Sequence, residues 1–129
     1  MRPNEISYKV IGAAISVHTA LGSGLLESAY DKCLCCEFSR VPLQFQRQVK
    51  LPIDYHGVTI SPAYRIDFIV ESLVVVEIKC VEKLLPIHRT QLLSYLRLAK
   101  LPLGLLLNFK VAHMRDGVAR IINAPEAEL

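Results

Sequence analysis

The sequence predicts an α/β or α+β fold, with a mixed central β-sheet flanked by helices. Two observations support this prediction. Apolar residues recur three and four positions apart near the start of the chain and again after residue 86, a spacing typical of amphipathic helices. Runs rich in β-branched residues, bounded by turn residues, lie between and after these segments and are typical of strands. The order helix, helix, strands, helix, strand, strand therefore predicts a sheet covered by helices.

Length and composition indicate one folded domain. The chain has 129 residues, of which 52% are hydrophobic and 21% charged, a composition that excludes intrinsic disorder. We expect a single domain over residues 1–129, with loose tails at 1–4 and 124–129. The net charge of +3 permits nucleic-acid binding without requiring it.

The start of the chain lacks the apolar core of a signal peptide, and no apolar run approaches the roughly 20 residues that span a bilayer. We therefore expect a cytoplasmic protein without a membrane partner. The four cysteines are Cys33, Cys35, Cys36 and Cys80. Three of them crowd into one helical turn, unlike zinc-ligand pairs, so we interpret them as buried small hydrophobes. An iron–sulfur or zinc role is the alternative.

Two helices are predicted in the first third of the chain. The first spans residues 5–21 and ends at Gly22-Ser23-Gly24, where a glycine can adopt the positive φ of a C-cap. The second spans about 25–39. Its first turn carries Glu27, a carboxylate that the helix dipole favours at that place. Compensation of the dipole is thus the simplest role for Glu27.

A third helix is predicted over about 87–100, closed by Pro102. Within it His88, Gln91 and Tyr95 follow one another at spacings of three and four, which places them on one face. The leucines between them would pack against the sheet. We interpret His88 as a residue of the helix N-terminus rather than as a phosphate contact.

The strands are predicted from alternation and turn residues. Pro42 begins an extended stretch that reaches a turn at 55–57, and 58–60 returns as a short strand. A hairpin over 64–81 follows. After the third helix come a buried strand at 103–110, a turn at 115–117 and a last strand at 118–123.

The central hairpin carries three charges inside apolar strands: Asp67, Glu77 and Lys79. Glu77 and Lys79 are two apart, so they point to the same face, and an internal ion pair between them is the simplest structural explanation. Asp67 lies opposite Glu77 if the numbers of paired residues sum to 144. That register centres the hairpin on Ser72 and requires a loop with an odd number of residues, or a bulge with the same effect.

Two carboxylates beside a lysine favour a divalent-metal site over a structural ion network, because three charges in core strands need a shared reason. Hard oxygen ligands suit Mg²⁺ or Mn²⁺, which keep several waters and bind substrate phosphates. A metal ion in this setting activates water and neutralises phosphodiester charge, and a neighbouring lysine can hold that water. Phosphodiester hydrolysis is the reaction that this group fits best.

The residues resemble the PD-(D/E)XK nuclease superfamily. Asp67 followed by Glu77-Ile78-Lys79 on the next strand is similar to its signature, and Gln91 to Tyr95 resembles the Gln-x-x-x-Tyr motif of its exonuclease-related branch. The segment from Gly24 to Tyr30 matches the motif that names its GxxExxY family. The resemblance covers about residues 5–122 and extends to residues around these motifs: His18, Gln48, Tyr55-His56-Gly57, His88 and Leu107-Asn108-Phe109. Ile66 departs from it, since proline precedes the aspartate in the family pattern.

The resemblance implies a restriction-endonuclease-like core and a set of roles. Asp67, Glu77 and the main-chain carbonyl of Ile78 would ligate Mg²⁺ or Mn²⁺, and Lys79 would serve the attacking water. Glu27 would complete the acidic cluster or orient water. Further roles are substrate contacts for Gln91 and Tyr95, and a metal ligand or a packed helix residue for His18.

Three hypotheses follow. The first is a metal-dependent nuclease with DNA rather than RNA as its partner. The second is a nucleic-acid-binding or accessory protein with this fold and little cleavage activity. The third is a structural oligomerisation module whose charges form a buried network. A homodimer could use the apolar segments 84–86 and 101–103.

Overall fold

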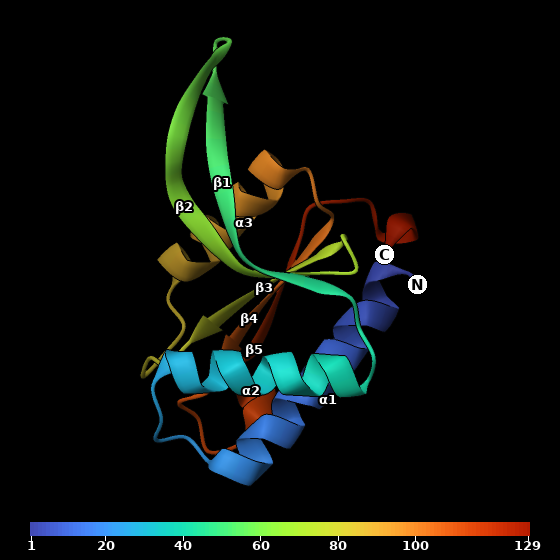
Figure 1. The fold of residues 1–129 in the computed structure, drawn as a ribbon, viewed down its shortest axis with the longest axis vertical. Helices are drawn as coiled ribbons and strands as arrows, with labels where there is room; N and C mark the ends of the chain where they lie inside the picture. Colours follow the sequence, from blue (N-terminus) through green and yellow to red (C-terminus); the bar gives the residue numbers. More distant parts are fainter.

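The computed structural model describes the backbone of residues 1–129 and every side chain except those of Pro62 and Ala63. Three α-helices and five strands form the fold (Figure 1). The helices are α1 (Pro3–Leu21), α2 (Glu27–Arg40) and α3 (Pro86–Ala99). The strands are β1 (Phe45–Tyr55), β2 (Val58–Val70), β3 (Val74–Lys79), β4 (Leu103–Asn108) and β5 (Val118–Ile122). Two short 3₁₀-helices are η1 (Met114–Gly117) and η2 (Glu126–Glu128).

The five strands form one mixed sheet in the order β1-β2-β3-β4-β5. Only the β3–β4 pair is parallel among these neighbours, and α3 makes the crossover between those two strands. One hydrophobic core lies between the sheet and helices α1 and α2. A second core lies between the other face of the sheet and α3. The predicted fold, a restriction-endonuclease-like mixed sheet flanked by helices, is confirmed.

The helix ends follow local sequence rules. Gly22 ends α1 with φ 75°, the positive value expected for a glycine C-cap. Pro86 is the first residue of α3, and His88 Nδ1 accepts a hydrogen bond of 2.9 Å from the Leu85 N–H. His88 is therefore a capping residue, as predicted. Lys100 ends α3 in the left-handed conformation, with φ 58°.

The second helix begins two residues later than predicted, at Glu27. Before it, the Tyr30 hydroxyl donates to the Gly22 carbonyl and accepts from the Leu25 N–H, at 2.6 and 3.2 Å. Tyr30 thus satisfies backbone groups of the loop between α1 and α2. It is fully buried and stacks on Phe109 with ring centroids 4.3 Å apart.

The hairpin register is the one predicted. Phe68, Ile69 and Val70 pair with Val76, Val75 and Val74, so the residue numbers of each pair sum to 144 and the loop consists of residues 71–73. Glu71 and Ser72 both have positive φ, 52° and 56°, which is unusual for residues other than glycine. The Glu71 carboxylate accepts a hydrogen bond of 2.7 Å from the Gln44 N–H. The Glu71 N–H in turn donates one of 2.8 Å to the Gln44 carbonyl. These bonds hold the loop in its strained conformation.

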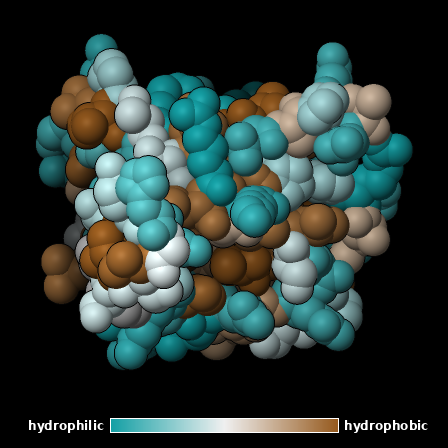
Figure 2. All heavy atoms as spheres, turned by 90° about the horizontal axis from the view of Figure 1, so that it is seen from above, coloured by the Kyte–Doolittle hydropathy of each residue, from teal (hydrophilic) through white to brown (hydrophobic). Residues whose placement is uncertain are grey.

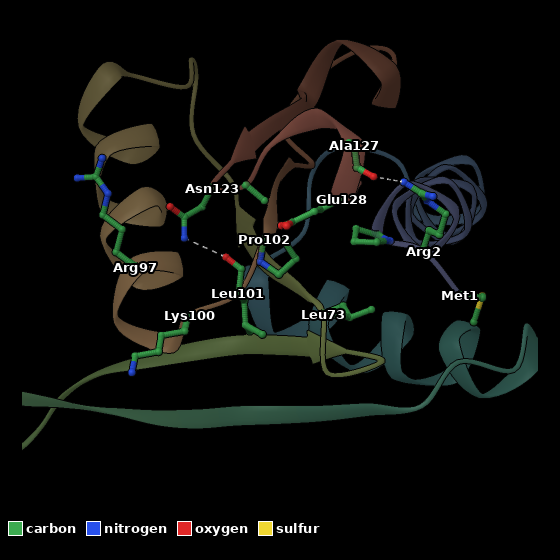
Figure 3. A pocket seen from close by; sticks show the side chains of 12 residues that line it. Met1, Arg2, Leu73, Arg97, Lys100, Leu101, Pro102, Asn123, Ala127 and Glu128 are labelled. Carbon is green, nitrogen blue, oxygen red and sulfur yellow. Dashed lines mark hydrogen bonds between the residues drawn. The ribbon is translucent and has the colours of Figure 1, made fainter.

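Several expectations about the strands and chain ends were wrong. The segment 58–60 is part of one long strand, β2, which pairs with β1 along the whole hairpin. The tails are not loose: Asn4 N–H bonds the Leu129 carbonyl, and Leu129 is buried. Figure 3 shows the pocket beside these ends, where the Arg2 guanidinium donates to the Ala127 carbonyl. Long-range backbone contacts, which no local pattern reveals, order both termini.

Two further expectations hold only in part. Cys36 is exposed, and the other three cysteines are partly buried, so none is a fully buried hydrophobe. In the segment 101–103, Leu103 belongs to the core and is unavailable to a partner, whereas Leu85 of the segment 84–86 is 48% exposed. No helix among the described residues is long and apolar enough to cross a membrane.

The close approach of η1 to β4 gives a stability prediction. A Cβ on Gly117 would lie 2.1 Å from the Asn108 carbonyl oxygen, a backbone atom that cannot move alone. We expect Gly117→Ala to lower the free energy of unfolding by about 2 kcal/mol, measured by chemical denaturation. Gly12→Ala is the matched control, because nothing lies within 4 Å of its Cβ inside α1. The control should raise stability by about 0.5–1 kcal/mol. Equal effects of the two substitutions would contradict the packing at Gly117.

Candidate active site

The two acidic residues of the central hairpin lie where β2 and β3 separate. Backbone pairing runs from Val70 and Val74 as far as Phe68 and Val76. Beyond that point the backbone N–H groups bond side-chain carboxylates instead of backbone carbonyls. Glu77 Oε2 accepts the Asp67 N–H at 2.7 Å, and Asp67 Oδ2 accepts the Ile78 N–H at 2.8 Å. Each acid therefore replaces a ladder acceptor for the opposite strand, and the strands form a fork.

The fork also directs a carbonyl toward the acids. In a β-strand the N–H and C=O of one residue point to the same side. Because the Ile78 N–H points to Asp67, the Ile78 carbonyl faces the fork as well. The next residue points the other way, since the Lys79 carbonyl accepts from Phe109 N–H on the β4 side. One oxygen of each carboxylate and the Ile78 carbonyl thus converge at the fork.

Burial of these acids opposes their ionisation. Glu77 is only 5% exposed, and burial followed by the negative charge of Asp67 raises its pKa from 4.5 to about 8. Burial likewise raises the pKa of Asp67, while the hydrogen bond from the Ile78 N–H opposes that rise. The charge of Lys79 favours the ionised form of both acids, but it is a smaller effect. A buried carboxylate next to a half-buried one ionises more readily when an additional cation lies beside both.

Helix α3 contributes to the site from its face of the sheet. Tyr95 is buried, and burial followed by the charge of Glu77 raises the pKa of its hydroxyl, with Asp67 adding to the effect. Its ring lies beside that of Tyr64, with centroids 5.7 Å apart. Gln91 lies one turn earlier on the same helix face and is partly buried. The predicted Gln91–Tyr95 pair is therefore on the helix that packs next to the acids.

Helix α2 borders the other side of the fork. A pocket of about 240 Å³ is lined by Asp67, Ile78 and residues of α2 and β1. Glu27, the first residue of α2, lines this pocket, as does Asp31 one turn later. The third acid predicted from the sequence therefore faces the same pocket as Asp67.

Asp31 was missed by sequence reasoning. It is 6% exposed, and its carboxylate accepts hydrogen bonds from the Arg47 guanidinium and from Gln48 Nε2. Gln48 has φ 53°, and it stands at the β1 position opposite Asp67, between the pairs Arg47–Phe68 and Val49–Ile66. The bonds to Asp31 thus hold a strained residue directly across the ladder from a site acid. The available signal was the spacing of Asp31, four residues after Glu27.

His18 lies apart from the acids. Its Nε2 bonds the Val111 carbonyl at 2.8 Å, and its ring lies near that of Phe109. It lines a pocket between α1 and the segment 112–115, which shares no residue with the pocket of Asp67. The structure therefore supports the packed-histidine alternative for His18 better than the ligand one.

Asn108 braces the end of β3. Its side-chain amide donates to the Val81 carbonyl at 2.9 Å and accepts from the Val81 N–H at 3.1 Å. It is 2% exposed, and no buried side-chain polar atom among the described residues lacks a partner. Because Val81 follows Lys79 closely, Asn108 fixes the path of the chain just after the site.

The donor set fits a hard divalent cation. Among the described side chains, no group of three or more His, Cys, Asp and Glu is close enough to enclose a metal ion. Mg²⁺ binds instead through one or two carboxylates and several waters. Asp67, Glu77 and the Ile78 carbonyl supply that kind of set, and a cation would relieve the repulsion that raises the pKa of Glu77.

The raised pKa of Glu77 gives a pH prediction for the metal-free protein. A carboxyl whose pKa rises from 4.5 to about 8 on folding binds more protons when folded, so stability falls as pH rises through this window. Glu77→Gln removes the ionisation and should flatten the profile, raising the unfolding midpoint at pH 8 by about 4 °C or more. Thermal unfolding from pH 4.5 to 8.5 measures this. Glu5→Gln, on the exposed face of α1, is the control. A variant profile as steep as that of the wild type would refute the assignment.

The contact between Asp31 and Gln48 gives a second prediction. Asp31→Ala removes the acceptor that holds Gln48 at positive φ, and it should cost about 1–3 kcal/mol in chemical denaturation. In that background Gln48→Gly should restore about 1 kcal/mol, because glycine adopts positive φ freely. Gln46→Gly, at a residue of β1 that has no positive φ, should instead lower stability by about 0.5–1 kcal/mol. Similar effects of both glycines would show that Gln48 is not strained.

Comparison with known proteins places the chain in a family. No curated protein and no solved structure gave a match. A family model described as the PD-(D/E)XK nuclease superfamily matches residues 4–121, nearly the whole chain. This range contains the fork, both helices beside it, strands β1 to β4 and all of β5 except its last residue. The chain belongs to the PD-(D/E)XK nuclease superfamily.

Proposed function

We propose that this protein is a metal-dependent nuclease of the GxxExxY family that hydrolyses phosphodiester bonds of DNA in the cytoplasm. The observation that carries the proposal is the fork, where Asp67 and Glu77 each accept a backbone N–H of the opposite strand. Membership of the nuclease superfamily supports the reaction class. The segment from Gly24 to Tyr30 supports the narrower family. Within it Glu27 lines the pocket, and the Tyr30 hydroxyl bonds the Gly22 carbonyl of the loop before α2.

In this proposal Asp67, Glu77 and the Ile78 carbonyl hold one Mg²⁺ or Mn²⁺ ion. When bound, the ion lowers the pKa of a water molecule and neutralises charge on the phosphate. Lys79 holds the attacking water and stabilises the negative charge that develops at phosphorus. Glu27 orients water from the α2 side of the pocket, since it lines the pocket without a bond to either acid.

Gln91 and Tyr95 align the substrate strand from the α3 side. Tyr95 is suited to this role because its hydroxyl is close enough to Glu77 and Asp67 for their charges to raise its pKa, after the larger effect of burial. His18 is left out of the proposed ligand set, because the Val111 carbonyl occupies its Nε2.

The two other hypotheses differ in what they require of the fork. An accessory protein with little cleavage activity would bind DNA through the same site and turn over slowly. A structural module would keep Asp67 and Glu77 only as a buried network. The raised pKa of Glu77 speaks against the structural module, because an acid that resists ionisation is a poor partner for Lys79.

Cleavage assays on single- and double-stranded DNA with Mg²⁺ or Mn²⁺ test the proposal, with RNA of the same sequence beside them. Lys79→Ala should lower turnover about 10²-fold or more, with DNA affinity within about threefold of the wild type. Asp67→Asn keeps an oxygen that accepts the Ile78 N–H, so it should fold normally but lose metal binding in calorimetry. Lys9→Ala, at an exposed residue of α1, is the control. Cleavage that persists in both site variants would exclude this site.

A further inference from the structure

The outer part of the β1–β2 hairpin, residues 49–66, forms an arm that projects from the body of the protein (Figure 1). One face of the arm is apolar: Leu51 and Ile66 are buried against α3 together with Tyr95. Lys50 and Arg65 alternate with these residues along the strands, so they point away from α3. Both are exposed. The arm is therefore packed on one face and carries cations on the other.

Lys50 and Arg65 are direct cross-strand partners. Two like charges in this arrangement repel and destabilise the hairpin. The ion pairs among the described side chains join Arg40 to Glu37, Arg47 to Asp31 and Lys110 to Glu82, and neither Lys50 nor Arg65 takes part. The protein thus keeps two cations side by side without an ion-pair partner, although their repulsion lowers the stability of the hairpin.

The pair lies close to the fork. Arg65 is two residues before Asp67 on β2, and the rise of a strand puts their Cα atoms about 7 Å apart. No ion pair among the described side chains joins either cation to Asp67 or Glu77. The arm cations are therefore beside the acids without serving as their counter-ions.

We propose that Lys50 and Arg65 bind the phosphate backbone of the nucleic acid strand that enters the fork. This inference rests on the proposed function and adds a substrate-binding surface to it. The pocket is lined by three acids, Asp67, Asp31 and Glu27, and by two cations, Lys32 and Arg47, of which Arg47 is paired with Asp31. Its acidic excess repels a polyanion until cations beside it hold neighbouring phosphates. Lys50 and Arg65 meet that need, and relief of their mutual repulsion adds to binding.

The arm presents its two cations on a surface of mixed polarity, on which Tyr55, Val58 and Ile60 are also exposed. Figure 2 looks down on this end of the molecule and shows polar side chains spread between smaller groups of apolar ones. Interfaces with nucleic acids are polar and basic. Phosphate contacts carry no sequence information, so the arm would position the strand and not select its sequence.

Binding of a labelled DNA duplex and of its single strand, at several salt concentrations with Ca²⁺ or Mg²⁺ present, tests the proposal. All proteins carry Lys79→Ala, which should slow turnover about 10²-fold or more. Lys50→Gln with Arg65→Gln should weaken binding at least tenfold in low salt and reduce the slope of log K against log salt by about 1.4–1.8. Lys9→Gln with Arg115→Gln removes the same charge from exposed remote residues and should change the slope little.

A charge reversal separates binding from folding. Lys50→Glu turns the repulsive pair into an attractive one, so the DNA-free protein should unfold about 1–4 °C higher while DNA binding weakens more than tenfold. Damage to the fold would lower both quantities. If affinity and salt slope match those of the Lys9 and Arg115 control, the arm does not bind phosphates and the inference is overturned.

The cleavage assay of the wild-type protein, taken together with these binding data, distinguishes this inference from the proposed function. Wild-type protein that cleaves DNA, with arm variants that bind like the control, overturns the arm alone. Wild-type protein that neither binds nor cleaves nucleic acid overturns both the nuclease and the arm.

Discussion

The exchange of backbone hydrogen bonds for carboxylate hydrogen bonds at the β2–β3 fork is the interaction on which the site depends. Strands that separate leave N–H groups without ladder acceptors, and such groups are costly when buried. Here the Asp67 N–H donates to the Glu77 carboxylate, and the Ile78 N–H donates to the Asp67 carboxylate. The same side chains therefore close the sheet and supply the oxygens of the site. Loss of either acid would disturb both.

This double use explains the unfavourable electrostatics. An acid that replaces a ladder acceptor has to lie within the sheet, where burial and the second acid raise the pKa of Glu77 to about 8. The arrangement stabilises the backbone geometry at the expense of ionisation. A divalent cation at the fork would reverse that balance, because it favours both charges where neither Lys79 nor solvent compensates them fully. Fold and metal affinity are thus coupled through the same two side chains.

The sequence was sufficient for those features of the site that depend on strand periodicity. The register in which Asp67 opposes Glu77 followed from parity alone. Asp31 and Gln48 could not be found in this way. Gln48 adopts a positive φ that no propensity predicts for glutamine, and its partner Asp31 comes from a helix 17 residues away. The partner of His18 could not be found in this way either, since its bond to Val111 spans 93 residues.

The stability of the arm and its proposed binding of phosphates favour different charges at Lys50 and Arg65. A hairpin that served only the fold would place opposite charges, or none, at Lys50 and Arg65. Its inner face already buries Leu51 and Ile66 against α3, so this packing and the β1–β2 pairing hold the arm in place. The rigidity gained on that face allows the outer face to carry repelling charges without loss of the strand pairing. A packed inner face is thus the physical condition under which the arm can present two cations beside an acidic fork.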